Sequence, residues 1–384
     1  MPGRVLILRG ADTWPGCCEF GRGVSASIYF SETYATAREK FRAAVRAAGA
    51  DLEVHQNPAR GPDGERLTTD IAFLGTRDPE RLFVLVAGTH GIEGFCGSGV
   101  LVGELANGLV QDLPPDTGAL LIHGLNPYGF AWLRRVNEEN VDVNRNFVDR
   151  SQPPPRNSAY DELKDAICPR EWSEAALEAA QRVIDAYSRQ HGERAFVRAV
   201  MAGQYSYPDG LLYGGQGLSW SARLLINLLR KHGSRARHVA FVDLHTGLGP
   251  YGYGEIMSSH AADSPGYRRL RDWFGEEVTC DEAGTSSAPL QEGETVAGVA
   301  AALPQAEVTG ITLEFGTVEK YEVFNALRGD NWLHLYGDIN SPLGREIKAR
   351  IRRAFYPETD DWKRRVWERS VEVGQRALRG LAAA

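Results

Sequence analysis

The stretch LFVLVAGTHGIEG, residues 82–94, joins a continuous apolar run to a turn that carries His90 and Glu93. An apolar run of this length is typical of a strand that is buried on both faces of the sheet in an α/β protein. Open α/β sheets bind their ligands at the carboxyl ends of the strands, which is where this turn lies. An imidazole and a carboxylate three residues apart on such a turn can reach one zinc ion, so the stretch predicts both a fold class and a metal site.

Similar apolar runs recur along the chain, with helical segments between them. The runs cover residues 71–75, 81–88, 119–126, 238–245 and 309–316, and the helical segments cover about 96–108, 172–190, 219–232, 264–276 and 343–382. Ahead of these, Ser31 can cap a helix that runs to Ala48, and residues 52–56 read as a further strand. This alternation predicts an α/β protein, a three-layer α/β/α sandwich around a central mixed, mostly parallel sheet.

The length of 384 residues fits one large domain. Residues 1–24 show no clear periodicity and are expected to be an N-terminal extension of unknown role. Residues 25–384 are expected to form a single catalytic domain with an insertion at about 151–215. The insertion is expected to begin at SQPPPRNSAY, because consecutive prolines can join neither a helix interior nor a strand ladder.

Composition and charge exclude several kinds of partner. The net charge is −7 and there is no long run of Lys or Arg, so we expect no nucleic acid partner. No apolar run approaches the roughly 20 residues of a membrane helix, and the first residues do not resemble a signal peptide, so we expect a cytoplasmic protein without a membrane partner. Five cysteines fit reduced thiols better than a disulfide framework.

A second strand-end histidine supplies the third ligand that a zinc site needs. His245 ends the apolar run HVAFVDLH in the same context as His90, and two histidines with Glu93 leave a fourth position for water. Asp243 shares its face of the strand, where it either orients an imidazole or makes an ordinary strand-end hydrogen bond. Glu314 interrupts the apolar strand ITLEFGT and is either the general base or a partner in a structural salt bridge.

The segment between the two histidines is rich in polar side chains. Residues 126–147, NPYGFAWLRRVNEENVDVNRNF, follow directly after a strand. Arg145, beside Asn144, can bind a substrate carboxylate because a guanidinium group matches the two carboxylate oxygens. Arg135, or alternatively Arg134, can polarise a substrate carbonyl and hold the oxyanion that forms on attack.

Together these motifs resemble the zinc carboxypeptidase superfamily, from about residue 30 to the carboxyl terminus. The resemblance rests on His90-x-x-Glu93, the NPYGF turn, Asp142-x-Asn144-Arg145-Asn146-Phe147, His245 and Glu314. Within the superfamily, THGIEG, RRVNEENVDVNRNF and DLHTGLG are most similar to a bacterial branch of uncharacterised carboxypeptidase-like proteins. That branch is related to the aspartoacylase and succinylglutamate desuccinylase group.

The resemblance implies a zinc-dependent hydrolase that cleaves an amide bond. One zinc ion would be held by His90, Glu93 and His245. Glu314 would activate the zinc-bound water as general base and then act as the acid. The implied substrate is a small peptide or another small molecule that bears a carboxylate.

Further roles are implied for the polar segment. Asn144 and Arg145 would bind the substrate carboxylate, and Arg135 would polarise the scissile carbonyl. Asp142 aligns with a residue that supports a zinc-binding histidine.

One departure bears on the substrate. Digestive carboxypeptidases close over the substrate with a mobile tyrosine between the last histidine ligand and the base, and this chain has no tyrosine between Tyr267 and Tyr321. An N-acyl-amino-acid amidohydrolase is therefore an alternative to a peptidase, with Tyr205, Tyr207 or Tyr213 as hypothetical substrate contacts. A catalytically inactive zinc-binding relative is a further alternative, which the complete set of ligands and base disfavours.

Overall fold

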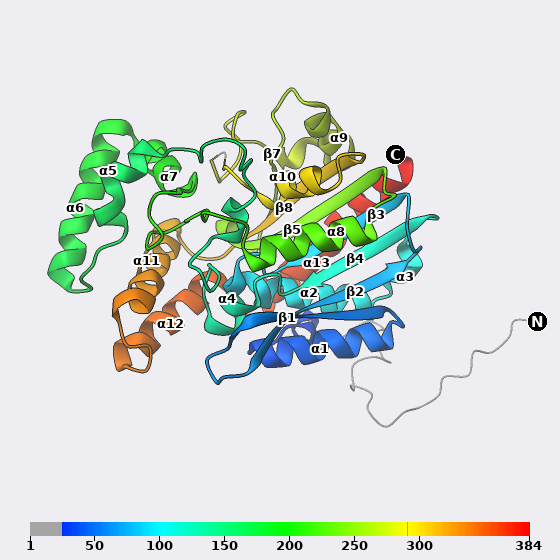
Figure 1. The fold of residues 1–384 in the computed structure, drawn as a ribbon, viewed down its shortest axis with the longest axis horizontal. Helices are drawn as coiled ribbons and strands as arrows, with labels where there is room; N and C mark the ends of the chain where they lie inside the picture. The colour runs from blue at the N-terminus through cyan, green and yellow to red at the C-terminus, as the bar shows by residue number, and fades with distance from the viewer. Residues whose placement is uncertain (1–24, 290) are drawn as a thin grey trace, which may run out of the picture.

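A single sheet organises the computed structural model, which describes residues 25–289 and 291–384. Within these residues eight strands lie in the order β1-β2-β4-β3-β5-β8-β6-β7 (Figure 1). They are β1 (Asp51–Arg60), β2 (Arg66–Gly75), β3 (Arg81–Ala87), β4 (Thr117–His123), β5 (His238–Tyr251), β6 (Gly254–Ser258), β7 (Val278–Thr279) and β8 (Glu307–Gly316). The central strands β4, β3, β5 and β8 are parallel, and the pairs β1–β2, β2–β4 and β6–β8 are antiparallel. The predicted mixed, mostly parallel sheet is confirmed.

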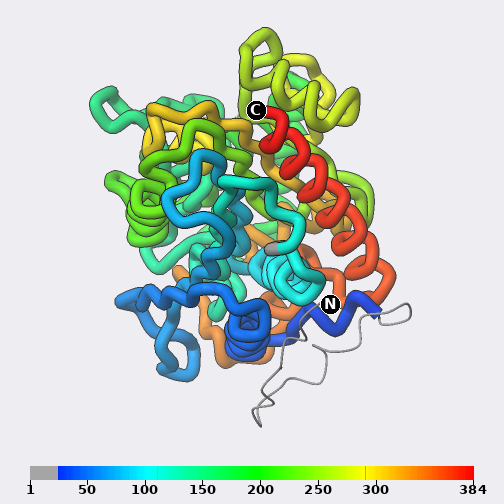
Figure 2. Tube along the Cα trace, turned by 90° about the vertical axis from the view of Figure 1, so that its right-hand side faces the viewer, coloured from blue at the N-terminus to red at the C-terminus, as the bar shows by residue number. Residues whose placement is uncertain are grey.

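Helices cover both faces of the sheet because its central strands are apolar on both faces. Along β3, Phe83 and Leu85 belong to the core on one face, whereas Val84 and Val86 belong to the core on the other. The first face is covered by α1 (Tyr34–Ala47), α2 (Gly94–Ala106), α9 (Pro265–Phe274) and α13 (Asp360–Ala383), with α13 beside α2 (Figure 2). The second face is covered by α8 (Trp220–His232) and α10 (Thr295–Ala302). The predicted three-layer sandwich is therefore confirmed.

A further group of helices lies beyond one end of the sheet (Figure 1). The group contains α5 (Ser158–Ile167), α6 (Glu174–His191), α7 (Glu193–Met201), α11 (Lys320–Tyr336) and α12 (Pro342–Phe355). Two shorter helices, α3 (Leu109–Asp112) and α4 (Pro127–Trp132), follow α2 and β4. The segment 151–215, expected to be an insertion, forms α5, α6 and α7. The expected extension, residues 1–24, lies outside the described residues.

Two predicted helix boundaries are wrong. Thr33, and not Ser31, caps the first helix: Thr33 Oγ1 accepts a hydrogen bond from Thr36 N (3.1 Å), and Thr33 N donates to Thr36 Oγ1 (3.2 Å). The predicted helix over 343–382 is two helices, α12 and α13. The break follows from Pro357, which has no amide hydrogen and disfavours the helical conformation in the residue before it.

Three of the five cysteines lie within the described residues. Cys96, Cys168 and Cys280 are free, and Cys17 and Cys18 lie outside the described residues. Across residues 25–289 and 291–384, no helix combines the length and apolarity needed to cross a membrane.

Candidate metal centre and its pocket

Close packing holds the turn that follows β3. A Cβ atom on Gly91 would lie 2.0 Å from the carbonyl carbon of Gly129, so only glycine fits there. The amide of Gly91 donates to the carbonyl oxygen of Arg135 (3.1 Å), and the amide of Ile92 donates to that of Arg134 (2.8 Å). These contacts fix the turn that carries the first two candidate ligands.

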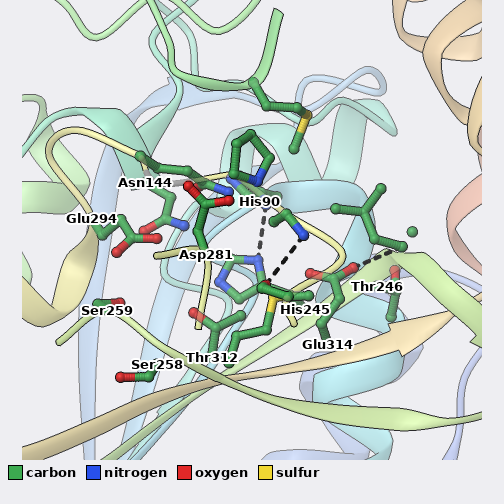
Figure 3. A pocket seen from close by; sticks show the side chains of 18 of the residues that line it. His90, Asn144, His245, Thr246, Ser258, Ser259, Asp281, Glu294, Thr312 and Glu314 are labelled. Carbon is green, nitrogen blue, oxygen red and sulfur yellow. Dashed lines mark hydrogen bonds between the residues drawn. The ribbon is translucent and has the colours of Figure 1, made fainter. Parts of the chain in front are cut away.

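The third candidate ligand reaches this turn because β3 and β5 are parallel neighbours, and Ala87 at the end of β3 pairs with Leu244, the residue before His245. His90 Nδ1 lies 2.9 Å from Glu93 Oε1, and His245 Nδ1 lies 2.9 Å from Glu93 Oε2. The Nδ1 atoms of His90 and His245 are 3.0 Å apart (Figure 3). The side chains of His90, Glu93 and His245 are all buried. The structure therefore brings the three predicted ligands together as a group that could hold a metal ion.

The donor atoms fit a zinc ion. Ligand atoms bound to Zn²⁺ at about 2.0–2.1 Å in a tetrahedron are about 3.3 Å apart, close to the separations found here. Burial opposes the ionisation of Glu93, but the neighbouring imidazoles of His90 and His245 hold its pKa well below the ordinary value. A buried, ionised carboxylate between two imidazole nitrogens is a donor set that a divalent cation completes.

A carboxylate lies behind each imidazole. Asp142 Oδ1 is 3.0 Å from His90 Nε2, and Asp243 Oδ2 is 3.1 Å from His245 Nε2. Contacts of this kind favour the tautomer that leaves Nδ1 free for a metal. Burial by itself would lower the pKa of His245, but the charges of Asp243 and Glu93 raise it well above its usual range. Asp243 also accepts hydrogen bonds from the hydroxyls of Thr89 (2.8 and 3.0 Å) and Thr295 (2.8 Å), so its position agrees with both roles left open for it.

Glu314 lies on β8 directly beside His245, because β5 and β8 pair in parallel with these two residues in register. The backbone N–H of Leu248 donates to Glu314 Oε1 (2.9 Å). Among the ion pairs of the described residues none includes Glu314, so the salt-bridge alternative finds no partner there. Burial and then the negative charge of Glu93 raise the pKa of Glu314. A carboxyl group shifted in this direction can accept and return a proton near neutral pH.

The two adjacent arginines point to different places. Arg135 lines the pocket, and its Nε donates to Asp142 Oδ2 (2.8 Å) while its Nη1 lies 3.5 Å from Glu93 Oε1. The Nε of Arg134 donates instead to Asp330 Oδ2 (3.0 Å). Of the pair, Arg135 is the arginine beside the candidate ligands.

Asn144 and Arg145 follow Asp142 on a short 3-10 helix, but only Asn144 lines the pocket. Asn144 Oδ1 accepts a hydrogen bond from the amide of Thr295 (2.9 Å). The guanidinium of Arg145 is buried and donates to the carbonyl oxygens of Asn144 (2.7 Å) and Met201 (2.8 and 3.2 Å). The predicted carboxylate clamp thus does not open onto the pocket, because chain carbonyls take up its donors.

The tyrosines suggested as substrate contacts are also absent from the described residues that line the pocket. Tyr205, for example, is buried and donates its hydroxyl to the carbonyl oxygen of Arg145 (2.7 Å). The pocket has a volume of about 70 Å³ and adjoins a mainly apolar cavity of about 460 Å³. Met201, Leu248 and Val323 line both.

One end of the pocket carries polar side chains that the sequence analysis missed. They are Ser258, Ser259, Asp281, Glu294 and Thr312 (Figure 3). They come from the end of β6, the segment between β7 and α10, and β8. The one local signal for any of them is the pair of serines that follows Ile256 and Met257.

One protein-family model matches most of the chain. Residues 30–369 match the model described as "Protein of unknown function (DUF2817)". The chain belongs to this family. No curated protein matches it.

Several solved structures are similar to the DUF2817 chain. Carboxypeptidase A from Helicoverpa armigera is 11% identical, with 84% of this chain and 74% of that chain covered and a TM-score of 0.44. A putative succinylglutamate desuccinylase/aspartoacylase from Shewanella frigidimarina is 18% identical, with 75% and 70% covered and a TM-score of 0.35. The murein-tripeptide amidase of Escherichia coli O157 is 17% identical, with 77% and 91% covered and a TM-score of 0.33. Similarities at this level leave the chemistry of the DUF2817 chain to its own side chains.

Proposed function

We propose that the DUF2817 chain is a zinc-dependent hydrolase that cleaves an amide bond, with one zinc ion held by His90, Glu93 and His245. The observation that carries this proposal is the convergence of their donor atoms at 2.9–3.0 Å, beside the carboxyl group of Glu314. The proposed substrate is a small peptide or another small molecule that bears a carboxylate. Neither nucleic acid nor a membrane is part of the proposal.

Each polar group of the site has a distinct task in such a reaction. A bound zinc ion would supply Lewis acidity, polarising the substrate carbonyl and lowering the pKa of water. Glu314 takes the proton of the attacking water and returns it to the leaving nitrogen, for which its raised pKa suits it. Arg135 holds the carbonyl oxygen as negative charge develops on it. Asp142 positions both His90 and Arg135, since one oxygen contacts each of them.

The second candidate function is hydrolysis of an N-acyl amino acid. It uses the same ligands and the same base as a peptidase. The observation that favours it is the pocket wall, which among the described residues contains no tyrosine that could close over a peptide carboxylate. Asn144 lines the pocket, and the charge of Arg145 lies behind it. These two residues would interact with the substrate carboxylate of either a peptide or an N-acyl amino acid.

The test of the proposed function separates metal binding from turnover. Purified protein loaded with zinc is offered short peptides and N-acyl amino acids, with and without chelator, and the products are measured together with the zinc content. Glu314→Gln should retain the zinc and lose hydrolysis by about 10²–10⁴-fold, because a general base contributes about that much. His245→Ala should lose both.

Glu319→Gln is the matched control, because Glu319 is exposed and makes no side-chain hydrogen bond at the start of α11. It should keep both zinc and hydrolysis. Full zinc loading with unchanged hydrolysis in Glu314→Gln would refute the assigned mechanism. Absence of zinc binding by the unmodified protein would refute the proposed function itself.

A further inference from the structure

Glu294 lines the polar end of the pocket, and nothing in its local role as a helix terminus explains its position. It is the residue before α10, yet its side chain makes no capping hydrogen bond to that helix. The carboxylate lies instead with Asn144 and Ser259 around the pocket (Figure 3). Glutamate is a poor helix cap, so its place here is better explained by the pocket than by the helix.

The backbone around Glu294 is tied to the scaffold of the metal centre. The carbonyl oxygen of Gly293 accepts a hydrogen bond from the amide of Phe147 (3.0 Å). The amide of Thr295 donates to Asn144 Oδ1 (2.9 Å), and its hydroxyl donates to Asp243 Oδ2 (2.8 Å). Both neighbours of Glu294 are therefore fixed, and the backbone of Glu294 has a set place relative to the candidate ligands.

The carboxylate of Glu294 has no cationic partner of its own among the described residues. The nearby Asp281 differs in this respect, because Arg194 (2.9 Å) and Arg198 (3.0 Å) both pair with it. Arg145 is close enough to interact electrostatically, but its guanidinium donates to chain carbonyls. Glu294 is partly buried, and a partly buried carboxylate without an ion pair is stabilised when a cationic ligand binds it.

We propose that Glu294 binds a cationic group of the substrate, an amine or a guanidinium, and so makes this chain select substrates that carry one. Ser259 beside it offers a hydroxyl oxygen as a further acceptor for the N–H groups of such a cation. The inference rests on the proposed function, whose substrate class it narrows. The substrate is then an amide with a positively charged substituent on the side of the bond that faces Glu294.

The test compares paired substrates on the zinc-loaded, full-length enzyme. Each pair is a short peptide or N-acyl amino acid with lysine, and the same compound with Nε-acetyl-lysine, which keeps the lysine carbon chain but ends in a larger, neutral amide. The unmodified enzyme should prefer the lysine compound, and Glu294→Gln should lose about 10- to 100-fold in kcat/KM on it, because a charge-assisted hydrogen bond is lost. On the acetylated compound, the kcat/KM of Glu294→Gln should be nearly the same as that of the unmodified enzyme. Glu294→Asp, which keeps the charge, should retain part of the preference.

Glu292→Gln is the matched control, because Glu292 is exposed and lies two residues from Glu294 in the same segment. It should leave the preference unchanged. The measured quantity is the ratio of kcat/KM on the lysine compound to kcat/KM on the acetylated compound. If this ratio is the same for the unmodified enzyme and for Glu294→Gln, the inference is overturned, but the proposed hydrolase function is not. If no compound is hydrolysed, the proposed function fails instead, and calorimetric binding of agmatine decides the inference alone. Agmatine should then bind the unmodified protein and the control at least 10-fold more tightly than Glu294→Gln, and equal binding would overturn it.

Discussion

Replacing Asp330 by Asn should destabilise the protein, because this buried carboxylate forms ion pairs with Arg134 and Lys348 near the turn that carries His90 and Glu93. Asp330 Oδ2 accepts a hydrogen bond from Arg134 Nε (3.0 Å), and Oδ1 accepts one from Lys348 Nζ (2.5 Å). The backbone carbonyl oxygen of Arg134 accepts a hydrogen bond from the amide of Ile92, in the turn that carries His90 and Glu93. The pair of ionic contacts thus supports the segment that holds the candidate ligands.

The magnitude follows from the pKa of Asp330. Burial would raise it, but Lys348 and Arg134 lower it from 3.8 to about 2. At about 1.4 kcal/mol per pKa unit, ionisation of this group stabilises the folded state by about 2 kcal/mol at neutral pH. Asparagine also leaves the two cations without a carboxylate, and breaking a buried ion pair costs about 3–5 kcal/mol. We expect Asp330→Asn to lower the free energy of unfolding by about 2–5 kcal/mol.

The sign of the pH dependence provides a second check. The folded-state pKa is depressed, so the stabilisation is complete above the ordinary pKa of 3.8 and is lost as the pH falls towards about 2. Protonated Asp330 resembles asparagine, so the difference between the two proteins should shrink as the pH falls through this range.

The assay is equilibrium unfolding in urea, followed by circular dichroism, at neutral pH and at the lowest pH where both proteins remain folded. Glu346→Gln is the control, because Glu346 is exposed on α12 two residues from Lys348. It should change the free energy of unfolding by less than about 0.5 kcal/mol. A loss below about 1 kcal/mol for Asp330→Asn at neutral pH, or a difference that does not change with pH, would refute the reasoning.

Two further predictions concern the metal centre. Asp142→Asn should weaken zinc binding by about 10- to 100-fold in a competitive chelator titration, since Asp142 contacts both His90 and Arg135; unchanged affinity would exclude its supporting role. Gly91→Ala should unfold the turn or lower the free energy of unfolding by more than about 2 kcal/mol, because its Cβ would meet the backbone of Gly129 at 2.0 Å. A normal thermal melt and normal zinc content for this variant would contradict the close packing described here.

The candidate ligands could be predicted from the sequence because each is marked by a local pattern. His90, Glu93 and His245 follow apolar runs that can only be buried strands, and Glu314 interrupts such a run. The register of parallel strands then brings the ends of β3, β5 and β8 to one edge. A polar residue after an apolar run, or a single carboxylate within one, was therefore enough to predict these four residues from the sequence.

The direction of the arginines could not be predicted in the same way. Arg134, Arg135 and Arg145 have similar local contexts, but only Arg135 lines the pocket. Which one does so depends on partners far along the chain, such as Asp330 for Arg134 and the carbonyl oxygen of Met201 for Arg145. The direction of these long, flexible side chains therefore depends on distant acceptors as well as on near neighbours in the sequence.

The sequence alone determined the α/β class and the three-layer arrangement and indicated the candidate metal ligands, because burial and the ends of apolar runs leave a pattern in the chain. Only the tertiary structure decided the character of the substrate pocket. Glu294 and Ser259 lie in segments without such a pattern, and they meet Asn144 through the pairing of β6 with β8 and the packing of α10 against the sheet. The candidate ligands and base of the proposed hydrolysis were therefore visible in the sequence, whereas the acidic end of the pocket emerged only when distant segments packed together.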